Sequence, residues 1–126
     1  MSERRLLIVD DDELIRELAI TCLELQDGWV IEQAESGMEA VVAASSKPPD
    51  AILLDVMMPE WDGPQTLEKL RAVPNLGDVP VIFLTAKTGR AERQRYSGLN
   101  VMGTIAKPFE AMELASQIAE ILGWPH

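Results

Sequence analysis

The segment AILLDVMMPEWDG, residues 51–63, joins a strand-like apolar run to an aspartate. Its first four residues are apolar, Asp55 follows directly, and Pro59 and Gly63 mark a turn after it. An ionised carboxylate without partners is strongly disfavoured in apolar surroundings. Asp55 is therefore expected to lie at the end of a buried strand, where other groups compensate its charge.

Five short apolar runs alternate with five helical patterns along the chain. The strand-like runs cover 5–9, 29–34, 51–54, 79–84 and 103–106. The helical patterns cover 13–25, 37–46, 64–72, 90–97 and 110–122. Five β-α units in succession predict an α/β fold, in which helices cover both faces of a parallel sheet.

The first predicted helix carries an apolar stripe along one side. Its members are spaced as the buried face of an amphipathic helix requires and are Leu14, Ile15, Leu18, Cys22 and Leu25. Cys22 is accordingly assigned to the core. Asp12, just before this helix, is interpreted as its N-cap in preference to a metal ligand, and both readings stay open. Gly123 is expected to end the last helix.

Length and composition exclude several classes of protein. The 126 residues fit a single domain with one core. The 11 Lys and Arg against 21 Asp and Glu give a net charge of −10, which disfavours direct binding to nucleic acid or anionic lipid. No apolar run approaches the roughly 20 residues of a membrane helix. The single cysteine excludes an internal disulfide and suits a cytoplasmic location.

Polar residues stand where the predicted strands end. The first strand is followed by Asp10 and Asp11, the third by Asp55, the fourth by Thr85 and the fifth by Lys107. In an open parallel sheet, functional groups gather beyond the carboxyl ends of the strands. Four separate segments are thus expected to bring acidic, hydroxyl and ammonium groups to one edge.

This set of groups suits phosphoryl transfer. Clustered carboxylates repel one another and require a cation, and hard oxygen ligands favour Mg²⁺ over Zn²⁺. A fixed ammonium and a hydroxyl add charge neutralisation and positioning, which supply most of the catalysis in phosphoryl transfer. Asp55 would be the nucleophile and would form an acyl phosphate without a general base. His126, the only histidine, is the last residue, which argues against a histidine-dependent triad.

Over about residues 4–123, the chain resembles the receiver domain of bacterial two-component response regulators. The motifs LLIVDDDELIRE, ILLDVMMPEWDG, VIFLTAK and IAKPF occur in the order and spacing of that family. The resemblance implies that residues 1–126 form a single flavodoxin-like (βα)₅ domain with strand order 2-1-3-4-5. It also implies a phosphoryl donor, either a sensor histidine kinase or a histidine phosphotransfer protein, and a downstream protein whose binding changes.

The resemblance assigns roles to the acidic residues one by one. Asp55 would be the phosphoacceptor. Asp11 and Asp55 would bind Mg²⁺ through their side chains, Met57 through its backbone carbonyl, and Asp10 through water. The side chain of Met57, together with Lys87, stands at the expected mouth of the site, where both would influence the approach of water.

The remaining roles concern the switch. By resemblance, Thr85 would bind a phosphoryl oxygen, and Lys107 would pair with Asp55 and then with the phosphoryl group. Pro108 would follow Lys107 through a cis peptide bond, a form largely confined to proline. Thr104 departs from the family, in which many members carry Tyr, Phe or His three residues before the lysine. A threonine has no ring to turn inward, so we expect the response in the loop after the fourth strand and in the polar segment 88–99.

Three alternatives belong to other classes. Asp10-x-Asp12 also begins the motif of haloacid-dehalogenase-like phosphatases, but the only acids beyond Lys107 lie on the last predicted helix. A nucleotide-binding enzyme would require a G-x-G-x-x-G motif or a P-loop, and neither occurs. An interaction module that keeps the fold without being phosphorylated is disfavoured by the complete Asp, Thr and Lys set.

Overall fold

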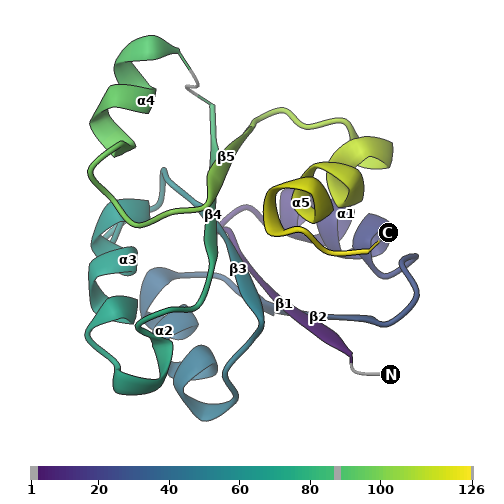
Figure 1. Ribbon diagram of the computed structural model, residues 1–126, viewed down its shortest axis with the longest axis horizontal. Helices are drawn as coiled ribbons and strands as arrows, with labels where there is room; N and C mark the ends of the chain where they lie inside the picture. The colour runs from purple at the N-terminus through teal and green to yellow at the C-terminus, as the bar shows by residue number, and fades with distance from the viewer. Residues whose placement is uncertain (1–2, 87–88, 126) are drawn as a thin grey trace.

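A five-stranded parallel sheet forms the middle layer of the protein in a computed structural model that describes residues 3–86 and 89–125, the side chain of Arg93 excepted (Figure 1). The strands are β1 (Arg4–Val9), β2 (Trp29–Ala34), β3 (Ala51–Asp55), β4 (Val81–Thr85) and β5 (Gly103–Ala106). They lie in the order β2-β1-β3-β4-β5, and every neighbouring pair is parallel. The strand order that the resemblance implied is confirmed.

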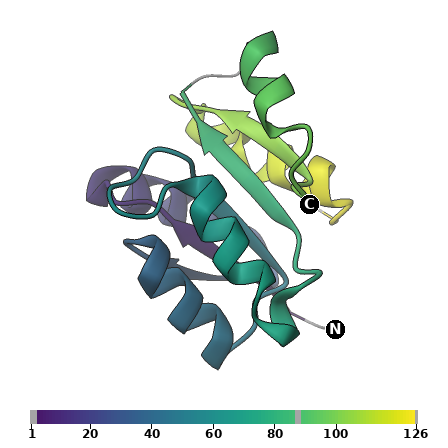
Figure 2. The same ribbon diagram turned by 90° about the vertical axis from the view of Figure 1, so that its left-hand side faces the viewer.

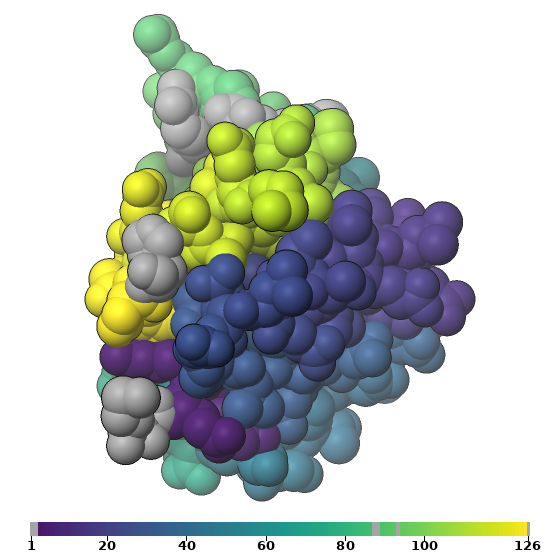
Figure 3. Space-filling view, turned by 90° about the vertical axis from the view of Figure 1, so that its right-hand side faces the viewer, coloured from purple at the N-terminus to yellow at the C-terminus, as the bar shows by residue number. Residues whose placement is uncertain are grey.

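Helices cover both faces of this sheet. They are α1 (Glu13–Leu23), α2 (Gly37–Ser46), α3 (Gly63–Arg71), α4 (Arg90–Tyr96) and α5 (Leu114–Leu122). Figure 2 shows α2, α3 and α4 on one face, with α4 at the end of the layer, and Figure 3 shows the opposite face with α1 and α5. The doubly wound α/β fold predicted from the alternating pattern is confirmed.

Strands β3 and β4 are buried along their whole length because helices cover them on both sides. Their side chains alternate between the two faces and feed two hydrophobic clusters. Ile52 and Phe83 join the cluster under α2 and α3, whereas Leu53 and Ile82 join the cluster under α1 and α5. This double burial explains why AILL and VIFL read as continuous apolar runs.

Helix α1 buries a different face from the one predicted. Leu14 and Leu25 are 75% and 71% exposed, and the buried residues are Arg16, Ala19 and Leu23. The prediction failed because a leucine repeat was taken for the contact face, whereas the small Ala19 sits against the sheet and polar partners hold Arg16 below the surface. The assignment of Cys22 to the core is also wrong, since this residue is half-buried.

The ends of the helices agree with the local sequence signals. The side chain of Asp12 accepts hydrogen bonds from the amides of Leu14 and Ile15, so its role as an N-cap is confirmed. Gly123 ends α5 in the left-handed conformation, with φ of 73°. The last helix differs in one respect, because 3₁₀ turn η2 (Ala111–Glu113) precedes α5. A further 3₁₀ turn, η1 (Pro74–Leu76), precedes β4. Over the described residues, every helix is too short or too polar to cross a membrane.

Candidate functional site

Two buried carboxylates lie side by side at the strand-end edge of the sheet. Asp10 directly follows β1 and Asp55 is the last residue of β3, and these strands are neighbours in the sheet. Their exposed fractions are 0% and 2%. Asp11 is exposed, yet one carboxylate oxygen from each of the three aspartates lies within 4.8 Å of the others. The structure therefore brings the three predicted acidic residues together.

Lys107 supplies the cation for this pair. It follows β5, and its Nζ lies 3.0 Å from Oδ2 of Asp10 and 3.3 Å from Oδ1 of Asp55. The backbone amide of Lys107 donates to the carbonyl of Thr85, which fixes the start of its side chain beside β4. The next peptide bond, to Pro108, is cis. The sequence predicted the contact with Asp55, and the shorter contact with Asp10 is new.

These surroundings make Asp55 a weaker acid than usual. Burial, followed by the neighbouring charge of Asp10, raises the pKa of Asp55 from 3.8 to about 6, although Lys107 and the amide of Met57 act in the opposite direction. Burial by itself would lower the pKa of Lys107, but its contacts with Asp10 and Asp55 raise it above the ordinary value. At pH 7, Asp55 is thus mostly ionised and Lys107 is protonated, as nucleophilic attack on phosphorus requires.

The turn after β3 holds Asp55 in place. The amide of Met57 lies 3.3 Å from Oδ1 of Asp55 and donates to it, while the Met57 side chain is exposed. At Gly63, a Cβ atom would lie only 2.8 Å from the Cα of Val56, so a residue without a side chain lets α3 begin against this strand end. Trp61 is partly exposed, and the Nζ of Lys69 lies 5.4 Å from its ring centroid.

The hydroxyl residues lie on the neighbouring strands. Thr85 ends β4, next to β3, and is buried. Thr104 is half-buried on β5 and pairs with Phe83, two residues before Thr85. Tyr96 of α4 packs edge-on against Phe83, with ring centroids 5.1 Å apart. Tyr96 and Thr104 also line a hollow of about 250 Å³. An aromatic ring thus lies near position 104, but it belongs to Tyr96 of α4. No pattern in the sequence indicated this placement.

The acidic residues fit a hard divalent cation. Asp10, Asp11 and Asp55 offer carboxylate oxygens close together and only partly compensated by Lys107, and oxygen ligands of this kind suit Mg²⁺. A ligand role for the backbone carbonyl of Met57 stays a prediction. Lys87, expected at the mouth of the site, lies outside the described residues.

A buried arginine, to which the sequence assigned no role, lies directly beside the site. Arg16 of α1 is 8% exposed, and its Nη1 donates to the carbonyl oxygen of Asp10 at 2.8 Å. Its position inside LLIVDDDELIRE, five residues after Asp11, could have pointed to it. The leucine stripe, however, suggested that this side of the helix faced solvent.

Comparison with known families decides what this arrangement is. Residues 6–119 match the family model of the response regulator receiver domain. The chain belongs to this family. Its fold is therefore that of a receiver, the phosphoacceptor domain of two-component systems.

Curated relatives of this receiver include larger response regulators. Response regulator MprA of Mycobacterium ulcerans is 36% identical over 118 residues, which are 94% of this chain and 50% of the relative. Response regulator MprA of Mycobacterium avium is likewise 36% identical over 118 residues. The chain spans about half the length of the curated relatives it matches.

Solved structures show the same architecture. The chemotaxis response regulator CheY4 of Vibrio cholerae has a TM-score of 0.88 at 27% identity, with 95% of this chain and 99% of that chain covered. The receiver domain of the sensor histidine kinase PA1611 from Pseudomonas aeruginosa has a TM-score of 0.83 at 28% identity, with 97% and 99% covered. In that structure a magnesium ion is coordinated in the active-site cleft.

Proposed function

We propose that this receiver accepts a phosphoryl group on Asp55 from the phosphohistidine of a sensor histidine kinase or of a histidine phosphotransfer protein. The observation that carries the proposal is the position of Asp55 at the end of β3, buried beside Asp10 and 3.3 Å from the Nζ of Lys107. Asp55 thus presents a carboxylate beside a fixed positive charge, at the edge where parallel sheets bind ligands.

The reaction follows from this geometry. A carboxylate oxygen of Asp55 attacks phosphorus, an O–P bond forms, the P–N bond of the donor breaks, and the released imidazole takes a proton from solvent. Lys107 faces the charge that develops on the phosphoryl oxygens. Thr85, at the end of the adjacent strand, would bind one of these oxygens. Mg²⁺, which Asp10, Asp11 and Asp55 would hold, supplies further positive charge when bound.

The same carboxylate predicts two accompanying activities. Because Asp55 needs no general base, a small acyl phosphate such as acetyl phosphate can serve as donor. The acyl phosphate that forms on Asp55 is open to attack by water, so the signal ends by hydrolysis. Output would be a change in the binding of a downstream protein. A cytoplasmic location, inferred from the single cysteine, stays part of this proposal.

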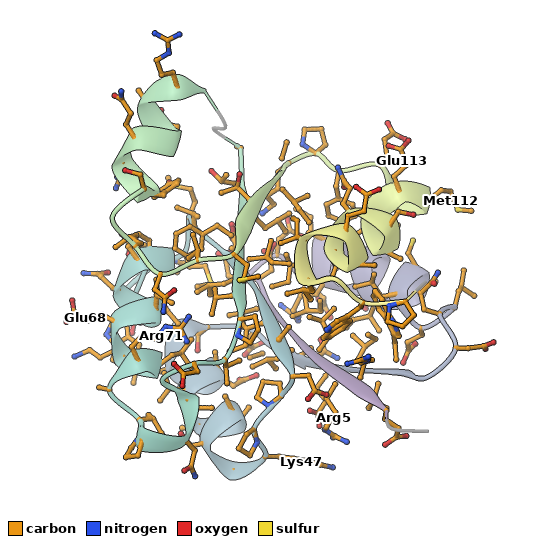
Figure 4. All side chains as sticks on the ribbon, in the orientation of Figure 1. Arg5, Lys47, Glu68, Arg71, Met112 and Glu113 are labelled. Atoms are coloured by element: carbon orange, nitrogen blue, oxygen red, sulfur yellow. The ribbon has the colours of Figure 1, made fainter. Side chains whose placement is uncertain are left out.

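Exposed apolar side chains beside the site favour a protein as the donor. Leu14 lies in the first turn of α1, Met57 is two residues after Asp55, and Met112 lies in η2, where it extends outward (Figure 4). All three are exposed, and all follow strand ends that carry site residues. Methionine is enriched at protein interfaces, and exposed apolar side chains gathered on one surface mark sites of protein interaction. We expect Leu14→Ser to slow transfer from a phosphohistidine protein and to leave acetyl phosphate labelling unchanged.

The test is labelling of the purified protein with acetyl phosphate and Mg²⁺, followed by mass spectrometry of the intact chain. One phosphoryl group should appear on the wild type and on Asp27→Asn, a control in an exposed aspartate of the α1–β2 turn. Asp55→Asn should remain unlabelled. Undiminished labelling of Asp55→Asn would reject Asp55 as the acceptor, and unlabelled wild type would favour an interaction module that is not phosphorylated.

A further inference from the structure

Arg16 is the one lysine or arginine whose described side chain is buried, and it lies beside the acidic site without belonging to it. Its three partners lie at the ends of two neighbouring strands. Its Nη1 donates to the carbonyl oxygen of Asp10 at 2.8 Å, its Nε donates to Oε1 of Gln33 at 2.9 Å, and its Nη2 lies 3.8 Å from Oε2 of Glu35. Arg16 therefore connects the end of β1, helix α1 and the end of β2.

We propose that Arg16 is the positioning residue of the cation site. It would set the orientation of Asp10 and Asp11, and with it the affinity of the unphosphorylated protein for Mg²⁺. The inference rests on the proposed function, because it assumes that these aspartates hold the cation. Arg16 itself touches neither the cation nor the phosphoryl group; it acts through the backbone of Asp10.

The contacts of Asp10 show why its carbonyl matters. Its backbone amide donates to the carbonyl of Ala34, and its carboxylate accepts from the amide of Asp12 and from Lys107. Arg16 binds the carbonyl, which is the remaining polar group of this residue. All polar groups of Asp10 are thus held, so its peptide plane cannot rotate without breaking a hydrogen bond. The next residue in the chain is Asp11, whose direction depends on that same peptide plane.

A buried guanidinium also resists loss of this arrangement. The cost of leaving a buried charged group without partners is large, so Arg16 keeps its contacts as long as the protein is folded. Its bond to Gln33 ties the loop of Asp10 to the edge strand β2 and not only to its own helix. Groups that orient metal ligands from outside typically change metal affinity by about 10- to 100-fold when they are removed.

The experiment measures Mg²⁺ binding by titration calorimetry on the unphosphorylated full chain. Arg16→Met removes both hydrogen bonds and the ion pair and should weaken Mg²⁺ binding by about tenfold. Arg16→Lys keeps the charge but cannot reach the three partners together, and its affinity should lie between those of Arg16→Met and the wild type. The backbone amide of Asp12 donates a hydrogen bond to the carboxylate of Asp10. In metal-free buffer, the proton of this amide should exchange faster in both variants.

Arg71→Met is the matched control. Arg71 likewise has three partners, the backbone carbonyls of Leu76, Val79 and Asn100, but it lies at the end of α3, far along the chain from the strand-end aspartates. Its replacement should lower stability and leave Mg²⁺ affinity within twofold of the wild type. Arg16→Met binding Mg²⁺ as tightly as Arg71→Met would overturn the inference. If Arg16→Met does not fold, Arg16→Lys decides by the same criterion.

Failure of this inference can be told apart from failure of the proposed function. A wild type that binds no Mg²⁺ and accepts no phosphoryl group contradicts both. A wild type that binds Mg²⁺ and is labelled on Asp55, with unchanged affinity in Arg16→Lys and Arg16→Met, contradicts only the role of Arg16.

Discussion

Helices α3 and α4 cover the same face of the sheet but are held in different ways. Helix α3 begins with a capping box between Asp62 and Gln65, buries Leu67 and Leu70, and ends at Arg71, which binds three carbonyls. Figure 4 shows Arg71 reaching from α3 toward the chain before β5. Each of these features adds stability of its own.

Helix α4 has fewer anchors. It spans seven residues, its N-cap is Gly89 without a side-chain hydrogen bond, and among its described side chains Tyr96 is the one that is buried. Helix α3, which follows the proposed acceptor Asp55, is therefore held more firmly than α4, which follows Thr85. We expect α4 to change when Asp55 is phosphorylated, since weakly packed segments open at low free-energy cost.

The largest expected effect comes from removing the ammonium group of Lys107, which lies beside Asp55. Lys107→Met leaves the buried carboxylates of Asp10 and Asp55 without a positive partner, and we expect a loss of about 3 kcal/mol in the free energy of unfolding at pH 7.5 without metal. Urea unfolding measures this loss, which should shrink at pH 5 because Asp55 then takes up a proton. Lys47→Met, at an exposed position, should change stability by less than about 0.5 kcal/mol. A similarly small change in Lys107→Met would contradict the role of this ion pair.

A second effect concerns pH. Because the pKa of Asp55 is about 6 in the folded protein against 3.8 as its ordinary value, ionisation of Asp55 opposes folding. The cost is absent below about pH 4, grows as the pH rises toward 6, and is complete above it, at roughly 2 to 3 kcal/mol. Asp55→Asn, which cannot ionise, should therefore be about 2 kcal/mol more stable than the wild type at pH 7.5 in metal-free buffer.

The pH dependence of this advantage gives the sharper measurement. Urea unfolding of both proteins between pH 4 and 8 should show the two free energies converging at the acid end. Saturating Mg²⁺ should also reduce the difference, because a bound cation compensates the wild-type carboxylate. An advantage of Asp55→Asn that stays constant across this pH range would contradict the raised pKa.

A third effect concerns α4, the less firmly held of the two helices. Beryllofluoride, which mimics the phosphoryl group on Asp55, should change hydrogen exchange in α4 and in β5 by several-fold, while α1 should change little. The physical reason is that Thr85, at the end of β4, moves toward the added charge. Helix α4 moves with β4, because Tyr96 of α4 packs against Phe83 of β4. If a change appears only after Thr104→Tyr restores a ring on β5, α4 does not carry the switch as proposed.

The smallest effect makes α4 more like α3. Gly89→Asp adds a capping side chain at a position where a Cβ atom meets no neighbour within 4 Å. Such an exchange is worth only a few tenths of a kcal/mol. Slower amide exchange at the start of α4 should reveal it, whereas global unfolding should barely change. Asp62→Gly is the mirror control in α3, where exchange should become faster by a similar factor. No change at either helix would mean that capping does not distinguish them.

Local signals in the sequence were sufficient for the elements and for most of the site. Alternating apolar runs and helical patterns predicted all five β-α units, and Asp12 and Gly123 marked helix ends through short-range hydrogen bonding and backbone geometry. The strand-end positions of Asp10, Asp55, Thr85 and Lys107 predicted one shared edge, because strands of a parallel sheet end together. These inferences succeed because each depends on neighbours in the chain or on the direction of the strands.

The sequence by itself therefore determined the order of elements, the edge of the sheet that carries the chemistry and the residues gathered there. Only the tertiary structure decided which stripe of α1 is buried, since periodicity records the spacing of leucines and not which side meets the sheet. Packing against β1 and α5 selects Ala19 and Leu23, and the carbonyl of Asp10 holds Arg16 below the surface. The approach of Lys107 to Asp10, 97 residues away, and of Tyr96 to Phe83 likewise depends on strand register and helix placement, which no local pattern encodes.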